Sequence, residues 1–392
     1  MRKAPGGRLW NGGISLLTRT RIRRLVAVTL AGLLLLTLGL SGCSRLGCSS
    51  ARKPLGGGAS GRLEVIGFYE NGDIQGQGGV QGPGDNEQTF VSSLPALEAN
   101  AKLIDIVSPY WYSVNADGAV TTAKPDPQVK KFSKDNKIKV WALVNNSKTG
   151  TQPAGGVLSD PKTRANAVKN ILEVADKGGY DGIFLDFQLI PPKDGPALTA
   201  MVRDLAKALH AKKKKLGVAL FPKIDVSPDV SGAYDYGALA KVSDMVLLMA
   251  YDRHYEGGPP GPVSPLSWVE ANLKSTLKSV AASKLVLAIG TYGYDWPVGG
   301  GNGEYVASRV ALARARKYGA KVKWDSDSGQ PYFTYTANGQ RHEVWFQDSQ
   351  AAAQRINLAK KHKLRGIGVW RLGFEEPGFW KVVSDNIGPK KK

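Results

Sequence analysis

Eight short apolar runs, separated by longer amphipathic segments, constrain the fold of this 392-residue chain more than any other feature. Such a run is typical of a strand in a parallel sheet, and the segments between the runs are typical of helices that cover the sheet. Eight strand and helix units predict an α/β protein, a closed (β/α)8 TIM barrel. The expected strands are 63–69, 103–112, 138–145, 183–187, 216–222, 245–252, 285–294 and 366–372.

The segment expected to form this barrel, 63–385, is longer than the roughly 250 residues typical of the fold. The surplus lies between the seventh and eighth strands, where short strand-like runs at 321–324, 331–336 and 342–346 alternate with turn-rich sequence. Short strands joined by turns usually pair antiparallel. We therefore expect a small antiparallel α+β insertion at about 298–348, beside the mouth of the barrel.

The first 43 residues have the pattern of an export signal. Four arginines between positions 19 and 24 precede a mostly apolar run, 25–40, and Ser41-Gly42-Cys43 follows. This pattern predicts a signal peptide, since the apolar run is short for a membrane span. Residues 40–43 resemble a bacterial lipobox, in which Cys43 carries lipid; an uncleaved signal anchor is the alternative. We expect 44–62 to be a flexible linker and 386–392 a basic tail.

The composition limits the chemistry of the folded part. The chain has 53 Lys and Arg against 33 Asp and Glu, a formal net charge of +20. This excess suits anionic wall polymers, lipid headgroups or nucleic acid, and export argues against nucleic acid. Both cysteines, Cys43 and Cys48, lie near the leader, so we expect neither a disulfide nor a thiol nucleophile in the barrel. The four histidines show no metal-ligand spacing, and we expect no metal and no cofactor.

One carboxylate and one amide follow the apolar run of the fourth expected strand. Asp186 lies within 183–187, and Gln188 stands two residues later. A period of two places both on the same side of the strand. A charge in a buried strand is costly unless the strand's C-terminal end opens into a site, and TIM-barrel active sites lie at that end. We therefore expect Asp186 and Gln188 to face a site together.

The residues around this pair resemble glycoside hydrolase family 18. Asp181-Gly182, Asp186 and the polar residue at 188 are similar to the family's strand-four pattern, Asp-Gly-x-x-x-Asp-x-Glu. Residues 249–252, Met-Ala-Tyr-Asp, are similar to its Met-x-Tyr-Asp pattern, and Trp370 is similar to its tryptophan at the end of strand eight. Residues 251–268 and 370–380 are similar to the branch that contains spore-germination and cortex-associated glycosidases of bacteria.

This resemblance implies a substrate-assisted, retaining reaction on glycans that contain N-acetylglucosamine, such as peptidoglycan, spore cortex or chitin-like polymers. An acid protonates the glycosidic oxygen while the substrate's N-acetyl carbonyl attacks the anomeric carbon. By this resemblance, Asp186 would orient the acetamido group and Tyr251 would donate its hydroxyl to the acetamido carbonyl. Trp370 would form the floor beneath the sugar, and Asp181 would support the strand.

Two positions depart from the family pattern. Phe184 stands where many members have Asp or Asn, and Gln188 stands where the family has its acid. An amide cannot deliver a proton, and a general acid typically contributes about 10²–10⁴ in rate. The sequence leaves open a glycosidase with reduced or lost activity, a carbohydrate-binding pseudoenzyme, and a scaffold for protein contacts. An amide can still exchange hydrogen bonds with a sugar oxygen, which keeps binding without hydrolysis reasonable.

Other candidate residues follow neighbouring strands. Glu70 follows the first strand and Asp252 follows the sixth, so either could replace the missing acid or bind sugar hydroxyls. Aromatic residues at strand ends either stack on sugars or belong to the core. The remaining candidates for substrate binding are Met249, Tyr110, Trp111 and Tyr292. We expect a monomer that is exported and either lipid-anchored at the cell membrane or held in the cell wall or spore envelope.

Overall fold

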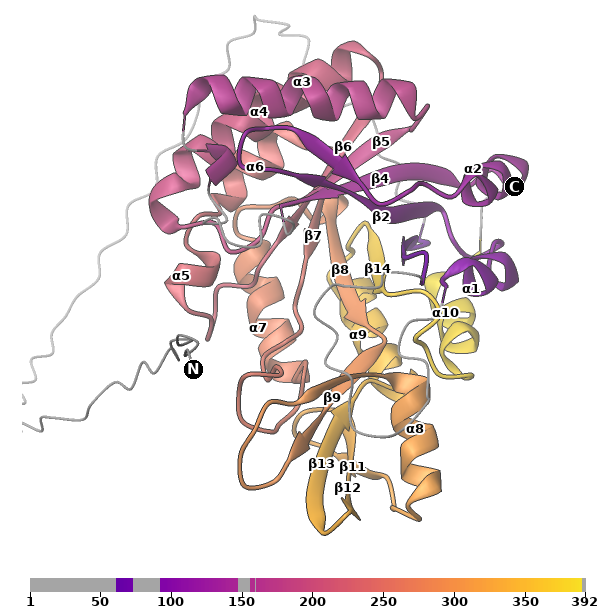
Figure 1. Cartoon of the computed structure of the whole chain (residues 1–392). Helices are drawn as coiled ribbons and strands as arrows, with labels where there is room; N and C mark the ends of the chain where they lie inside the picture. The colour runs from indigo at the N-terminus through magenta and orange to yellow at the C-terminus, as the bar shows by residue number, and fades with distance from the viewer. Residues whose placement is uncertain (1–60, 73–91, 147–155, 159, 390–392) are drawn as a thin grey trace, which may run out of the picture. The chain divides into compact units, whose positions relative to one another are not determined.

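The computed structural model describes residues 61–72, 92–146, 156–158 and 160–389. The expected signal peptide, Cys43 and all but the last two residues of the expected linker lie outside these residues, as do 390–392 of the basic tail. Figure 1 shows a barrel of strands surrounded by helices and, below it in orange, a smaller antiparallel sheet. None of the helices in the described residues is long and apolar enough to cross a membrane.

Eight parallel strands form the closed barrel that the sequence predicts. They follow one another in the order β1-β14-β8-β7-β6-β5-β4-β2, and β1 pairs with β2 to close the ring. In this closure Ile66 lies opposite Gly368 on one side and Ile106 on the other. The eight strands are β1 (Glu64–Tyr69), β2 (Ile106–Val114), β4 (Lys139–Asn145), β5 (Gly182–Asp186), β6 (Lys215–Leu220), β7 (Met245–Leu248), β8 (Leu285–Gly290) and β14 (Gly366–Trp370). A short strand that the sequence analysis missed, β3 (Val120–Thr122), pairs antiparallel with β2.

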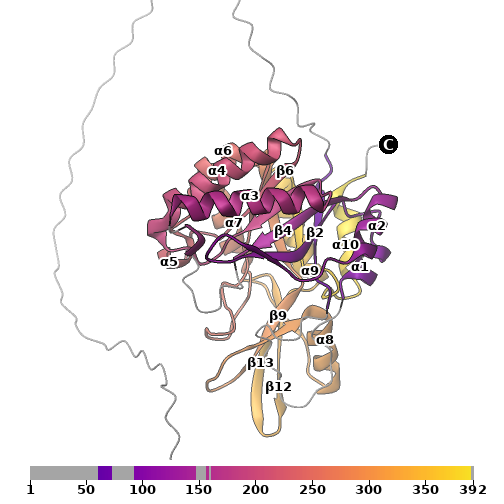
Figure 2. The same cartoon turned by 45° about the horizontal axis from the view of Figure 1, so that its top comes forward.

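Helices cover the outside of the barrel, as Figures 1 and 2 show. Several begin at an aspartate whose side chain accepts backbone N–H bonds at the helix start. Asp160, for example, accepts from Lys162 N and Thr163 N and is followed by a proline at the first helical position. The covering helices are α1 (Leu94–Ala99), α2 (Pro127–Asp135), α3 (Pro161–Lys177), α4 (Gly195–Ala211), α5 (Pro228–Ser231), α6 (Tyr236–Val242), α7 (Leu266–Thr276), α9 (Ser349–Lys361) and α10 (Phe379–Ile387).

Apolar side chains fill the interior of the barrel. Phe184 lies there with no exposed surface and packs edge-on against Phe68, with the ring centroids 5.4 Å apart. Phe68 in turn packs against Trp370 at 5.7 Å. A side chain at Gly217 on the adjacent strand would meet the Phe184 ring at 2.7 Å, so the glycine makes room for it. Phe184 therefore belongs to the packed interior of the barrel, in the same cluster as Trp370.

Three aspartates at the N-terminal end of the barrel each fix the start of a neighbouring strand. The Asp181 backbone N–H donates to the Val140 carbonyl at 2.9 Å, and its carboxylate accepts the Val140 N–H at 2.8 Å. Asp105 makes the same pair of bonds with Val65, and Asp244 makes it with Leu216. Asp181 therefore lies at the end of the barrel opposite to Asp186. At that end of the barrel, residues stabilise the fold and do not take part in catalysis.

Replacing Asp181 with alanine should destabilise the protein by about 1–2 kcal/mol, because the Val140 N–H would lose its charged acceptor. Asp181→Asn should lose less, since an amide oxygen still accepts this bond. Chemical denaturation measures both free energies of unfolding, with Asp327→Ala, at an exposed position, as a control. Equal stability of Asp181→Ala and the parent protein would contradict this supporting role.

The insertion between the last two barrel strands is a five-stranded antiparallel sheet with one helix. Its strands run in the order β10-β9-β13-β12-β11. We expected the seventh barrel strand to continue to residue 294 and the insertion to start near 298. The barrel strand instead ends at Gly290, because Tyr292 already pairs with Ala307 in the second sheet. The elements are β9 (Tyr292–Pro297), β10 (Glu304–Ala307), α8 (Ser308–Lys317), β11 (Lys323–Asp325), β12 (Gln330–Ala337) and β13 (Gln340–Phe346).

Candidate active site

The C-terminal ends of the barrel strands bring most of the candidate residues together. Tyr110 of β2, Tyr251 after β7 and Trp370 of β14 are partly buried and pack against the upper part of the barrel interior. Tyr110 and Trp370 meet edge to face, with their ring centroids 6.1 Å apart. These rings lie at the end of the barrel where this fold places its active sites.

Asp186 and Gln188 are in direct contact, as their shared side of the strand predicts. The Gln188 side-chain amide donates to both carboxylate oxygens of Asp186, at 2.9 Å each. The same nitrogen lies 3.9 Å from the sulfur of Met249. Asp186 is only 6% exposed, while Gln188 is partly exposed. The pair therefore consists of a buried acceptor and a partly exposed amide donor.

Burial raises the pKa of Asp186 from 3.8 to about 6, and the hydrogen bond from Gln188 opposes this shift. Phe184 precedes Asp186 by two residues and lies on the same side of β5. Its apolar ring offers the Asp186 carboxylate no hydrogen bond. A carboxyl in such a place is ionised only part of the time near pH 6.

A reciprocal bond fixes the backbone at Gln188. The Gln188 N–H donates to the Asn146 side-chain oxygen at 2.9 Å, and the Asn146 amide donates to the Gln188 carbonyl at 2.9 Å. Asn146 follows β4, so this pair links the ends of two neighbouring strands. Sequence reasoning did not single out Asn146. Its position after a buried strand, beside the strand of Asp186, was the available signal.

Tyr251 and Asp252 follow β7 and face the site from the side of the insertion. Burial raises the pKa of the Tyr251 hydroxyl well above its usual value, and the negative charges of Asp186 and Asp252 act in the same direction. Tyr251 therefore stays protonated and can serve as a hydrogen-bond donor. Burial also raises the pKa of Asp252 to about 6, against the hydrogen bonds that it accepts from Tyr292 at 2.6 Å and Tyr294 at 3.0 Å.

Tyr292 is a correction to the expected set of substrate-binding residues. It is 1% exposed, and its hydroxyl is already bonded to Asp252. Its ring packs edge-on against Tyr251 at 5.8 Å. Tyr292 therefore holds Asp252 and Tyr251 in place from the insertion and offers no free ring face to a sugar.

Tyr305 of the insertion is a site residue that sequence reasoning missed. Its hydroxyl oxygen is hydrogen-bonded to the Trp370 side chain, and the charges of Arg371, Asp252 and Glu70 act on it. Its ring lies 4.6 Å from that of Tyr292. Only the fold brings position 305 next to position 370, so no local sequence signal could have identified it.

Glu70 reaches the same region from the end of β1. Its carboxylate pairs with Arg371 at 3.1 Å, and both side chains are largely buried. Burial raises the pKa of Glu70, and the Arg371 charge opposes the shift. Glu70 is thus an ion-paired carboxylate at the rim next to Trp370.

Trp111 is a second correction. Tyr110 points into the barrel, but a bulge in β2 between Tyr110 and Tyr112 shifts the register, and the next two side chains point outward. Trp111 is 1% exposed and packs against Tyr69 at 6.1 Å. It therefore belongs to the layer between strands and helices and cannot stack on a ligand.

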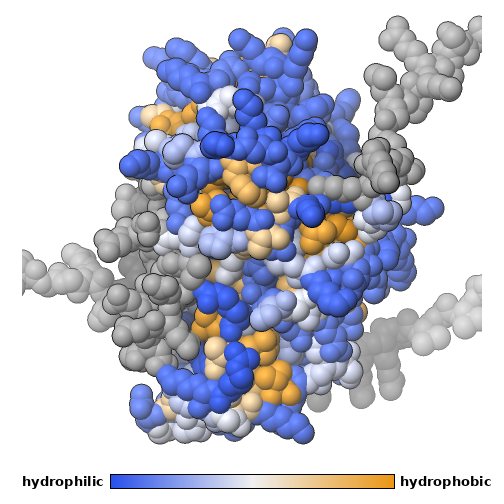
Figure 3. Space-filling model, turned by 90° about the vertical axis from the view of Figure 1, so that its right-hand side faces the viewer, coloured by the Kyte–Doolittle hydropathy of each residue, from blue (hydrophilic) through white to orange (hydrophobic). Residues whose placement is uncertain are grey.

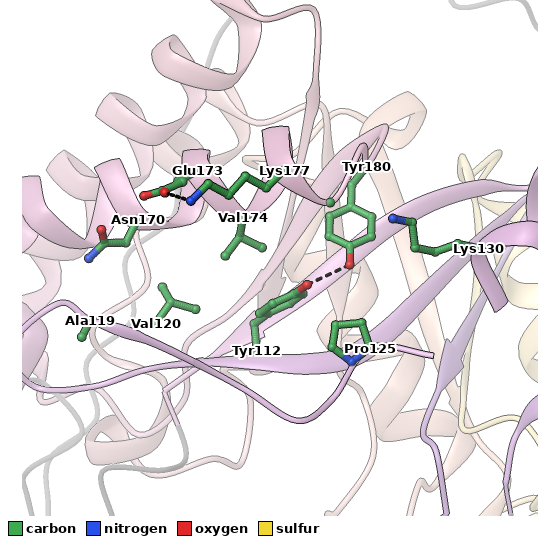
Figure 4. Close-up of a pocket in the computed structure, with 11 residues that line it drawn as sticks. Tyr112, Ala119, Val120, Pro125, Lys130, Asn170, Glu173, Val174, Lys177 and Tyr180 are labelled. Atoms are coloured by element: carbon green, nitrogen blue, oxygen red, sulfur yellow. Dashed lines mark hydrogen bonds and ion pairs between the residues drawn. The ribbon is translucent and has the colours of Figure 1, made fainter. Parts of the chain in front are cut away.

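A separate hollow of about 610 Å³ lies outside the barrel, beside α3 and β3. Figure 4 shows Tyr112 and Tyr180 at one end of it, with their hydroxyls 2.8 Å apart, and the Glu173–Lys177 ion pair at the other. It shares no lining residue with the candidate site. Among the described residues, no group of three acidic, histidine or cysteine side chains could hold a metal ion.

Comparison with known sequences identifies the family that this geometry resembles. The profile of Glycosyl hydrolases family 18 matches residues 72–375. A cortical fragment-lytic enzyme of Bacillus subtilis is 33% identical over 243 residues, which cover 60% of this chain and 56% of that protein. The glycosylase YvbX of Bacillus subtilis is 27% identical over 328 residues, which cover 81% of this chain and 94% of that protein.

Solved structures agree with this assignment. The spore cortex-lytic enzyme SleL of Bacillus megaterium QM B1551 matches with a TM-score of 0.72 and 26% identity, over 84% of this chain and 76% of SleL. A chitinase from Chromobacterium violaceum matches with a TM-score of 0.73 and 26% identity, over 84% of this chain and all of the chitinase chain. Both likenesses extend over most of the described barrel.

Proposed function

This chain belongs to glycosyl hydrolase family 18, and we propose that it binds N-acetylated amino-sugar polymers with little or no hydrolysis. One observation carries the proposal: the residue that touches Asp186 at the acid position is the amide of Gln188, which donates to both carboxylate oxygens. An amide has no proton to give to a leaving sugar oxygen. The loss corresponds to about 10²–10⁴ in rate.

The binding parts of the site are present in this arrangement. Asp186 is an acceptor that suits the N–H of an acetamido group, and the protonated Tyr251 hydroxyl suits its carbonyl oxygen. Trp370 is partly buried at the barrel mouth and supplies an apolar ring for a sugar face. Asp181 lies at the other end of the barrel and takes a structural role only.

Both neighbouring carboxylates that could take over the acid role already have side-chain partners. Glu70 is held by Arg371, and one oxygen of Asp252 accepts two tyrosine hydroxyls. Within the described residues, the Gln188 side chain is hydrogen-bonded to Asp186 and contacts Met249. It is hydrogen-bonded to neither Glu70 nor Asp252. Weak hydrolysis through Asp252 is the second candidate, because a pKa of about 6 leaves it partly protonated in mildly acidic solution.

The relatives and the leader support a ligand class and a location for the protein. The relatives include a cortical fragment-lytic enzyme, a spore cortex-lytic enzyme and a chitinase. We therefore propose peptidoglycan, spore-cortex glycan or a chitin-like polymer as the ligand, bound by a monomer. The basic and apolar segments before Cys43 support export, with lipid attached to Cys43.

Calorimetric titration with N-acetylglucosamine oligomers tests the binding step directly. Trp370→Ala should weaken binding about fivefold to thirtyfold, because stacking of a sugar ring on an aromatic floor contributes on the order of 1–2 kcal/mol. Trp324→Ala, on the insertion strand β11, is the matched control and should bind like the parent protein. The proposal would be wrong if glucose oligomers bound as tightly as N-acetylglucosamine oligomers, or if Trp370→Ala left binding unchanged.

A further inference from the structure

Exposed lysines surround the end of the barrel opposite the candidate site. The parallel strands all begin at this end, so the helix-to-strand connections lie there. Exposed lysines occur in, or just before, the connections that lead into six of the strands. These residues, called the lysine face below, are Lys102 (before β2), Lys137 (β4), Lys177 (β5), Lys213 (β6), Lys241 (β7) and Lys363 (β14).

Three of these lysines stand where the backbone favours glycine. Lys137, Lys213 and Lys363 have φ angles of 58°, 59° and 52°, each at the residue after a helix cap. This left-handed position at a helix end is usually occupied by glycine, as it is by Gly179 after α3, with φ 63°. Any side chain in this backbone conformation is less favourable than glycine. Lysine nevertheless occupies it three times at one end of the barrel, which indicates that the positive charge there has a function.

The acidic groups on this face bond to backbone N–H groups or to basic side chains, and they keep their negative charge. The carboxylates of Asp105, Asp181 and Asp244 each accept a strand N–H, and Asp176 lies within ion-pair distance of Lys212 and Lys214. Lys177 of the lysine face is itself paired with Glu173. A hollow of about 1080 Å³ opens on the same face, and its lining includes Arg62, Lys102 and Lys137 as well as Asp105 and Asp385. Three basic and two acidic side chains therefore leave the lining of this hollow with a net charge of +1.

Both ends of the described chain leave the barrel at the lysine face. The Leu63 N–H donates to the Ile387 carbonyl at 2.9 Å, next to the start of β1. In sequence, the proposed anchor and linker precede this point, and three further lysines, 390–392, follow it. Figure 3 shows the side that carries α2, where hydrophobic residues form small groups among hydrophilic ones.

We propose that the lysine face docks on a bilayer containing anionic lipid, so that the glycan site points away from the membrane. A ring of charges at one end of a barrel suits electrostatic contact with a broad charged surface. The choice of a lipid partner rests on the proposed anchor at Cys43, whose linker enters at this end. Each lysine that contacts such a surface contributes about fivefold in affinity, and salt weakens the attraction.

A structural role alone would also place lysines here, because cations near helix C-termini interact favourably with the helix dipole. The two explanations differ in what the triple variant Lys137→Gly, Lys213→Gly, Lys363→Gly should do. Glycine fits the left-handed backbone, so this variant should fold with a Tm close to that of the parent protein. Docking on a membrane predicts a large loss of vesicle binding, whereas a dipole role predicts none.

The test is co-sedimentation of the segment 57–392 with vesicles of phosphatidylcholine, alone or mixed with phosphatidylglycerol. This segment is one compact unit that contains the whole barrel and its apolar clusters, and it lacks Cys43, so failure of the anchor cannot affect the result. We expect binding to the anionic vesicles only, lost at high salt. The triple glycine variant should bind about a hundredfold more weakly.

The matched control removes the same charge from the rest of the protein through Lys124→Gln, Lys193→Gln and Lys321→Gln, all at exposed positions away from the lysine face. It should bind anionic vesicles like the parent protein. Equal losses in both variants would show that net charge alone is responsible and would overturn the proposal. Binding to soluble polyphosphate without binding to anionic vesicles would overturn it in favour of an anionic wall polymer. Glycan binding is measured in parallel, and its failure would leave the vesicle result standing.

Discussion

Replacing Gln188 with glutamate is expected to raise hydrolysis of N-acetylglucosamine oligomers by about 10²–10⁴-fold in kcat/KM. The physical reason lies in the contact with Asp186, whose two oxygens are each 2.9 Å from the Gln188 side-chain nitrogen. Two carboxyl groups this close cannot both ionise easily, so one of them keeps a proton at neutral pH. The pKa of Asp186 is already raised to about 6 by burial, which strengthens the effect.

Release of reducing ends from chitin oligomers and from peptidoglycan measures this gain. The double variant Gln188→Glu, Asp186→Asn is the control and should show little of it, because the acetamido group would lose its charged partner. If the natural protein already cleaves at the rate of Gln188→Glu, the proton comes from elsewhere. Asp252→Asn would then abolish the activity if Asp252 is that donor.

The sequence predicted the barrel well because its evidence is local and repeated. Each strand is a short apolar run, and each helix-to-strand unit buries its own apolar face, so eight strands could be counted before their pairing was known. Asp186 and Gln188 were placed together correctly because strand periodicity acts over two residues. The insertion was also predicted, although its first strand starts earlier than expected, since Tyr292 leaves the barrel directly after Thr291.

The errors at the site have causes that lie outside the local sequence. A bulge in β2 turns Trp111 away from the site, and nothing in Tyr-Trp-Tyr indicates where a bulge falls. Tyr292 and Tyr305 reach the site through the second sheet, whose pairings join residues far apart in the chain. Sequence therefore identifies residues that a barrel strand itself directs inward, and it misses those that the insertion delivers.

Asp186→Asn is expected to stabilise the protein at neutral pH by about 3 kcal/mol, although it should remove an essential polar group of the site. Burial raises the pKa of Asp186 from 3.8 to about 6, so the folded protein at pH 7 holds a charge that the unfolded chain accommodates more easily. Between pH 3.8 and about pH 6, Asp186 therefore keeps its proton in the folded protein and loses it in the unfolded chain. The contribution of Asp186 to stability is therefore fully present below pH 4 and is lost as the pH rises through 6.

Urea denaturation of the parent protein and of Asp186→Asn between pH 4 and pH 7 measures this difference. The gap between the two unfolding free energies should be small near pH 4 and should open as the pH rises, because the neutral amide does not titrate. Asp252 has a similar shift, but both proteins contain it, so its effect cancels in the difference. Asp204→Asn, at an exposed position of α4, should show no such opening. A gap that stays constant with pH would mean that Asp186 is not held in its buried, desolvated place, and the same result would remove the reason to expect a shared proton in Gln188→Glu.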